Sequence, residues 1–316
     1  MTEPEQYTHN TIFSRILVLL GVLQLLIGIA AVCFGPAELY CFYLFSEGGP
    51  FYYDGFGFGA LMFGYIACQI IGYYVIAAVF IPLGYGHVYR RRWTLPLSQT
   101  LLWFWLIIGL PVIGFFIPAA ASKQFSFTAY IVIPVLFVIL LYAGIPGILL
   151  WFYNHRTVRS IFSRHDTRTY WLNTVPIPVL VLVLLLLFYV LIFHALIFFQ
   201  CIFPFFGRFM TGFPGLIPIV FSIVFLLLVI YGILNRRIWA WYVLLAYFVL
   251  LAISLIVTFY RKNLADLLQL LQLPSEEAEI LQNVTIPDIY AVLFCLLPLV
   301  FTIGLIIYTR PKDITF

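Results

Sequence analysis

The chain has 316 residues, of which 64% are hydrophobic and only 9% are charged, and its formal net charge is +4. Soluble domains are about 45–50% apolar and about 25% charged. The composition therefore excludes a soluble globular domain, a disordered chain and a disulfide-rich secreted fold, and it predicts a polytopic membrane protein.

Eight stretches without any charged residue divide the sequence. Because a helix needs about 20 mostly apolar residues to cross the hydrocarbon core, we expect one span in each stretch. The predicted spans are residues 16–34, 58–83, 97–119, 129–153, 175–201, 214–234, 238–259 and 289–308. The predicted fold is thus an all-α integral membrane protein with eight transmembrane helices.

The basic residues between these spans predict the orientation of the chain. With the amino terminus in the cytoplasm, four basic residues lie on the outer side, namely Lys123, Arg208, Arg261 and Lys262. The other twelve lie on the cytoplasmic side, and all seven tryptophans fall towards that same half. Since cytoplasmic loops carry an excess of Lys and Arg, we expect both termini to be cytoplasmic, with the chain in the plasma (inner) membrane.

Two short segments with similar sequences follow the second and the sixth predicted spans. Residues 85–93 read YGHVYRRRW and residues 231–239 read YGILNRRIW, so that five of nine positions are identical. This similarity predicts an internal repeat of two four-helix halves, residues 1–157 and 158–316, both with the same orientation in the membrane. The alternative is that basic residues with tryptophan are simply common at cytoplasmic helix ends.

The same two segments supply the predicted lipid headgroup anchors, because basic and tryptophan side chains at helix ends contact the membrane interface. These anchors are Arg90, Arg91, Arg92, Trp93, Arg236, Arg237 and Trp239. The positive net charge therefore indicates the lipid bilayer as a partner and does not indicate nucleic acid.

Two outer segments of the chain are long enough to carry structure. Residues 35–57 are rich in Gly, Tyr and Phe and are expected to form an outer loop. Residues 264–271 place leucines at helical spacing and predict a short amphipathic helix on the outer surface, which Pro274 ends. Whether Cys33, Cys41 or Cys201 form a disulfide is left open, since that depends on the redox state of the compartment.

No predicted span contains an Asp, Glu, Lys or Arg in its interior. Buried carboxylates carry ion coupling in many transporters, and paired acidic residues carry catalysis in many membrane enzymes, so their absence argues against both functions. The sequence also lacks a nucleophile elbow and a His-Glu-x-x-His zinc motif. We therefore expect a protein that is not an enzyme and requires no metal or cofactor.

The remaining candidate site residues are the polar and helix-breaking residues of the spans. His194 is the titratable group within a span, and its imidazole is a potential ligand for a haem or pigment metal. Gln24 and Gln69 are candidate polar groups on a substrate path, although such amides more often join helices. Interrupted helices mark many transport sites, and the interrupting residues here are Pro111, Pro146 and Pro298.

These observations lead to three functional hypotheses. The first is a non-enzymatic accessory or scaffolding subunit of a membrane complex, with other membrane proteins as partners. The alternative is a transporter or channel for a neutral or lipophilic solute, whose path would be lined by the glutamines, the prolines and His194. The third is a pigment- or haem-binding membrane subunit that uses His194.

Overall fold

The computed structural model of the chain describes residues 3–46, 48–51, 61–121, 129–271 and 288–311. This part of the chain contains eight helices that are long and apolar enough to cross a membrane. They comprise Thr11–Phe45, Met62–Val88, Thr94–Gly114, Val132–Asn154, Ile177–Phe198, Gly212–Leu234, Ile238–Arg261 and Val292–Thr309. The prediction of eight membrane-length helices is therefore confirmed.

The first helix, α1 (Glu3–Phe45), extends beyond the expected span. We predicted an outer loop from residue 35, but α1 continues through Pro36 for nine further residues. A proline removes only one backbone hydrogen bond, and the residues that follow it are mostly apolar or aromatic, so an ordered helix satisfies their backbone better than a loop. The remainder of the predicted loop lies largely outside the described residues.

The fourth spanning helix is a composite of three segments. It begins as α4 (Ala129–Ile139), widens into a π-helical segment, η2 (Leu140–Gly144), and ends as α5 (Ile145–Asn154). Pro134 lies in α4 and Pro146 in α5, so that prolines flank the π-helical segment on both sides. Such wide turns are rare and frequently accompany functional sites.

The chain divides into two compact units. Unit 1 comprises Met1–Tyr52, Ile66–Trp103 and Ile145–Ile177, and unit 2 comprises Tyr53–Tyr65, Phe104–Gly144 and Pro178–Phe316. The helices α2 (Leu61–Val88) and α3 (Thr94–Ala121) and the composite fourth helix contribute residues to both.

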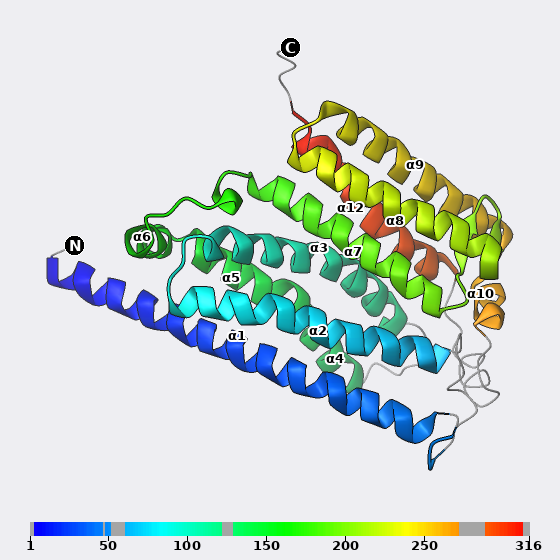
Figure 1. The fold of residues 1–316 in the computed structure, drawn as a ribbon, viewed down its shortest axis with the longest axis horizontal. Coiled ribbons are helices and arrows are strands. Elements are labelled where there is room, and N and C mark those ends of the chain that lie inside the picture. The colour runs from blue at the N-terminus through cyan, green and yellow to red at the C-terminus, as the bar shows by residue number, and fades with distance from the viewer. Residues whose placement is uncertain (1–2, 47, 52–60, 122–128, 272–287, 312–316) are drawn as a thin grey trace. The chain divides into compact units, whose positions relative to one another are not determined.

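In unit 1, α1 packs closely against α2 through glycines. A Cβ atom at Gly28 would lie 2.6 Å from Ile81 Cγ1, and one at Gly84 would lie 2.7 Å from the carbonyl oxygen of Gly21. The short helices α6 (Arg156–His165) and η3 (Trp171–Asn173) follow α5. Figure 1 shows α6 end-on, whereas α1, α2 and α5 run across the picture, so α6 lies across the direction of these long helices.

In unit 2, four helices enclose the largest hydrophobic core of the described residues. They are α7 (Ile177–Phe198), α8 (Gly212–Leu234), α9 (Ile238–Arg261) and α12 (Asp288–Thr309). Helix α9 packs against both α8 and α12. The side chains that are completely or almost completely buried include Leu182, Leu186, Ile219, Leu226, Leu244, Phe248 and Ile306.

A β-hairpin that the sequence did not predict joins α7 to α8. Its strands β1 (Phe203–Phe205) and β2 (Arg208–Met210) are antiparallel, and the two turn residues between them both have positive φ, as a type I′ turn requires. Helix α9 satisfies the backbone of this hairpin: Ser254 Oγ accepts the N–H of Phe206 at 2.9 Å, and Thr258 Oγ1 accepts the N–H of Gly207 at 3.1 Å. Irregular backbone near a membrane is stable where the protein itself supplies such partners.

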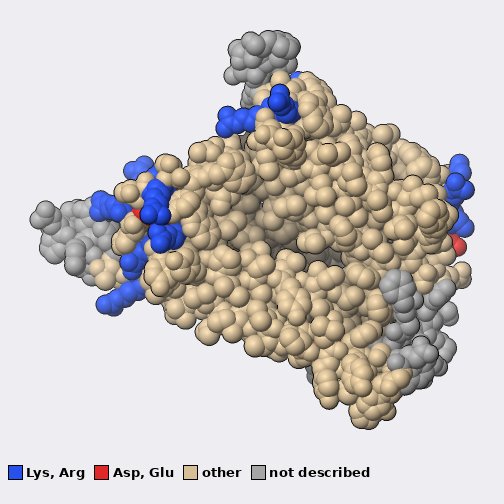
Figure 2. All heavy atoms as spheres, viewed as in Figure 1, with Lys and Arg blue, Asp and Glu red and all other residues tan. Residues whose placement is uncertain are grey.

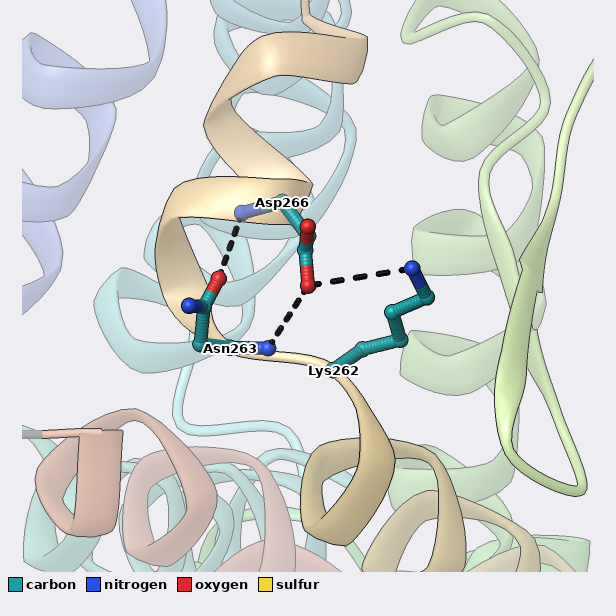
Figure 3. A network of polar contacts seen from close by, with 3 residues as sticks. All are labelled: Lys262, Asn263 and Asp266. Carbon is teal, nitrogen blue, oxygen red and sulfur yellow. Dashed lines mark hydrogen bonds and ion pairs between the residues drawn. The ribbon is translucent and has the colours of Figure 1, made fainter.

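The short helix predicted over residues 264–271 is present as α10 (Leu264–Leu270). Figure 3 shows its amino-terminal cap, in which Asn263 Oδ1 accepts the N–H of Asp266 at 2.8 Å and Asp266 Oδ2 accepts the N–H of Asn263 at 3.0 Å. Lys262 Nζ lies 4.0 Å from the same carboxylate. This reciprocal capping box explains why the helix begins at Leu264. Pro274, its predicted end, lies outside the described residues.

Candidate functional site

The two glutamines proposed for a substrate path lie in unit 1 and differ in their hydrogen bonding. Gln69 donates from Nε2 to the Tyr73 hydroxyl at 3.0 Å, one turn along α2. Gln24 is half-buried in α1, and its Oε1 atom is enclosed and has no hydrogen-bond partner among the described residues. Of the two, Gln24 therefore retains an unused acceptor.

His194 lies in unit 2, on the exposed side of α7. Its Nδ1 atom is 2.7 Å from the carbonyl oxygen of Val190, so Nδ1 carries the proton and donates to that oxygen. This tautomer leaves Nε2 as the atom that can ligate a metal. Among the described residues, no three His, Cys, Asp or Glu side chains form a group that could hold a metal ion.

The three helix-breaking prolines occupy different environments. Pro146 is buried in unit 1, and Pro111 is buried in unit 2, two residues beyond Gly109. A Cβ atom at Gly109 would lie 2.7 Å from Tyr142 Cβ, so α3 approaches the π-helical segment closely here. Pro298, in unit 2, is half-buried in α12.

A chain of hydroxyl groups in unit 2 begins at the carbonyl of Pro298. Thr302 donates from Oγ1 to the carbonyl oxygen of Pro298 at 2.7 Å. Because that proton is used, the Tyr189 hydroxyl donates to Thr302 Oγ1, at 3.0 Å. This chain joins α7 to α12.

A buried histidine that the sequence did not point to lies in unit 1. His87 is completely buried at the end of α2, and its Nδ1 lies 2.9 Å from the carbonyl oxygen of Leu83. Its Nε2 accepts a short hydrogen bond of 2.6 Å from the hydroxyl of Tyr153 on α5. Ser98 of α3 donates to the carbonyl of Thr94 and borders the same imidazole. Both ring nitrogens of His87 are therefore used in bonds within the protein.

A second polar group lies beside this histidine in unit 1. Gln99 of α3 donates from Nε2 to Asn154 Oδ1 at 3.0 Å, and Arg159 of α6 donates from Nη2 to the same oxygen at 2.6 Å. These bonds join α3, the end of α5 and α6. Such amide bonds between helices are the usual use of polar side chains in a membrane protein.

Asp166 fixes the end of α6 to the turn that follows α2. Its Oδ2 accepts the N–H of Arg92 at 3.1 Å and the hydroxyl of Tyr170 at 3.0 Å, and its Oδ1 accepts the N–H of Arg168 at 3.2 Å. Burial alone would raise the pKa of this carboxyl, but the three hydrogen bonds and the nearby Arg91 lower the pKa below its usual range. Asp166 is therefore ionised at neutral pH although it is only 5% exposed.

Arginines gather around Asp166 and form what we call the basic corner of unit 1. Its members are Arg90, Arg91, Arg92, Arg156, Arg159, Arg164 and Arg168. Figure 2 shows this concentration of Lys and Arg at the end of unit 1 where α6 lies. Four of the seven belong to α6 or to the segment after it, which lies between two of the predicted spans.

The two similar segments, which contain the predicted lipid anchors, form turns with the same backbone geometry. Arg90 and Arg236 both have positive φ, of 51° and 56°. The N–H of the following arginine donates to the carbonyl of the glycine five residues earlier, at 2.7 Å for Gly86 and 2.8 Å for Gly232. This is the Schellman pattern, which ends a helix by turning the chain sharply.

The comparisons with known proteins give no further indication of function. No protein-family model, curated protein or solved structure matches this chain. The candidate function therefore rests on the residues and contacts described above.

Proposed function

We propose that this chain is a non-enzymatic polytopic membrane protein that acts as an accessory or scaffolding subunit of a membrane complex. The observation that carries the proposal is how the buried polar groups of the described helices are used. The bonds of His87 with Tyr153, of Gln99 with Asn154 and of Tyr189 with Thr302 each join two helices within one unit. Groups committed to packing in this way favour a structural role over catalysis.

The proposal includes a duplicated architecture: two parallel four-helix halves, residues 1–157 and 158–316, with both termini in the cytoplasm and the chain in the plasma membrane. The equal backbone geometry of the turns after α2 and α8 supports it, because unrelated helix ends seldom place an arginine at positive φ. Reporter fusions at the two termini and after residues 92 and 237 test the topology. All four fusions are expected on the cytoplasmic side, and an outward position for any of them contradicts it.

Native mass spectrometry after purification in a mild detergent tests the scaffolding function. The expected result is a stoichiometric complex of this chain with at least one different membrane protein. A chain that is recovered only by itself, at every detergent concentration that preserves its fold, contradicts the proposal.

The π-helical segment η2 favours transport of a neutral or lipophilic solute as a second candidate function. It interrupts a spanning helix between two prolines, and interrupted helices form the substrate sites of many transporters. Within unit 1, the unused acceptor of Gln24 is a separate polar group that could contact a solute. Solute flux into liposomes that contain the purified chain tests this candidate, with Pro146→Ala and Gln24→Leu as variants. Flux that is absent, or unchanged in both variants, contradicts it.

The pigment- or haem-binding hypothesis is tested by the absorption spectrum of the purified chain. Because Nε2 of His194 is available as a ligand, this hypothesis predicts a visible band that disappears in His194→Ala. A spectrum without visible absorption contradicts it.

A further inference from the structure

We propose that the basic corner of unit 1 is a selective binding site for the phosphate headgroup of an anionic membrane lipid. This goes beyond general headgroup anchoring, which the turns after α2 and α8 would share. This lipid site and the scaffolding function are independent proposals. A chain without the lipid site could still bind a partner protein.

Helix α6 presents its arginines away from the protein. Val158 and Phe162 are completely buried, and Ile161 is almost so. Arg156, Arg159 and Arg164 lie on the exposed part of the same helix. Figure 1 shows that α6 lies across the direction of the long helices of unit 1. A helix placed in this way lies at the level of the lipid headgroups.

The turn of residues 90–92 is held rigidly beside α6. Arg90 Nη1 donates to Nε2 of His165, at 3.1 Å, and His165 in turn uses Nδ1 to donate to the carbonyl of Ile161. Asn173 donates to the carbonyl oxygen of Arg92 at 3.3 Å, and Asp166 accepts the N–H of Arg92. The arginines of the turn and those of α6 are therefore fixed relative to one another, as a binding site for one headgroup requires.

The neighbouring protein neutralises only a small part of the positive charge of the basic corner. Asp166 is the only acidic residue between Asp54 and Asp266 in the sequence, and its oxygens accept two backbone N–H groups and the Tyr170 hydroxyl. Within the described residues, none of the seven guanidinium groups forms an ion pair, and those of Arg90, Arg91 and Arg159 bond only the side chains of His165, Tyr85 and Asn154. An anion with several oxygens would satisfy such donors.

The exposed residues next to the basic corner favour a lipid over a soluble anion. Trp151 and Ile148 of α5 are 73% and 63% exposed, and Trp171 is 55% exposed. Tryptophan lies preferentially at the headgroup level, and isoleucine contacts acyl chains. A ligand that combines a phosphate group with acyl chains would contact both the arginines and this apolar surface.

The turn after α8 provides an internal control. Arg236 and Arg237 are exposed and have the same backbone geometry, and Trp239 is exposed beside them. The helix that follows this turn directly is the spanning helix α9, and no amphipathic helix comparable to α6 lies between them. The control therefore has two arginines at a helix end but lacks the additional arginines of α6.

The test is a titration of the full-length chain in a neutral detergent with phosphatidylglycerol or with phosphatidylcholine of the same acyl chains. Bound lipid is counted by native mass spectrometry at constant low salt. We expect wild type to prefer phosphatidylglycerol, and Arg156→Gln/Arg159→Gln/Arg164→Gln to lose most of this preference, because each arginine near anionic headgroups contributes about fivefold. Arg236→Gln/Arg237→Gln removes general headgroup anchoring only, so it is expected to lose much less of the preference than the α6 variant.

A replacement variant and a competition experiment complete the test. If the triple variant does not fold, Arg164→Gln alone replaces it, since Arg164 is exposed and its loss is expected to reduce the preference about fivefold. Inorganic phosphate, added as a competitor, is expected to leave lipid binding unchanged. Equal losses in the α6 and control variants, an unchanged preference in the α6 variant, or displacement of the lipid by inorganic phosphate would each overturn the proposal.

Discussion

Tyr153 donates a single short hydrogen bond to the completely buried imidazole of His87, and this bond joins α5 to α2. Tyr153→Phe removes the hydroxyl and leaves near Nε2 of His87 only Ser98 Oγ, at 3.4 Å, whose proton goes to the Thr94 carbonyl. An unsatisfied buried acceptor costs about 1–3 kcal/mol, so we expect a less stable unit 1. Thermal unfolding in detergent measures this effect, with the exposed Tyr231→Phe as a control. Equal stability of the two variants would refute a structural role for this bond.

Asp166 gives unit 1 a predictable dependence on pH. Because its pKa is lower in the folded chain than in the unfolded chain, its contribution to stability is complete above about pH 4 and is lost as the pH falls through the folded pKa. Asp166→Asn should therefore be less stable than wild type at pH 7, and this difference should shrink in acid. Unfolding measured from pH 3 to pH 7 checks the prediction, and a difference that is independent of pH contradicts it.

At the scale of elements, the contact between α1 and α2 depends on glycines at close approach. A Cβ atom at Gly84 would lie 2.7 Å from the backbone oxygen of Gly21, which cannot move aside as a side chain could. Gly84→Ala should therefore separate the two helices and cost about 1–3 kcal/mol.

Gly72 supplies a matched control on the same helix, since nothing lies within 4 Å of its Cβ position. Gly72→Ala should be neutral or slightly stabilising, because alanine favours a helix more than glycine does. Thermal unfolding of both variants compares them directly. A loss of stability in Gly72→Ala equal to that in Gly84→Ala would show that the contact with α1 is not the cause.

Some elements could be predicted from the sequence and others could not. The spanning helices and α10 follow from hydrophobic length and leucine spacing. Helix α6 could also have been recognised, because Val158, Ile161 and Phe162 recur at helical spacing among arginines. The β-hairpin could not, since its turn consists of Phe206 and Gly207 and its backbone partners are side chains of α9, far away in the sequence.

For the whole molecule, the distribution of charge was predictable and the use of the buried polar groups was not. In Figure 2 the middle of each unit shows almost no charged atoms, in agreement with the charge-free stretches of the sequence. His87 was quoted only as part of a repeat, because no local pattern shows that Tyr153, 66 residues away, bonds it. The rigid position of the basic corner likewise depends on Asp166, whose partners are separated from it by up to 74 residues.

The central claim, that the chain works by binding other membrane proteins, is tested most directly in intact membranes. A photoreactive residue is placed at exposed apolar positions such as Leu26 on α1 and Phe221 on α8, with the completely buried Leu186 as a control. Crosslinked products are then identified by mass spectrometry. We predict a discrete adduct with a different membrane protein from at least one exposed position, and no such adduct from Leu186. Adducts with lipid alone at every exposed position would contradict it.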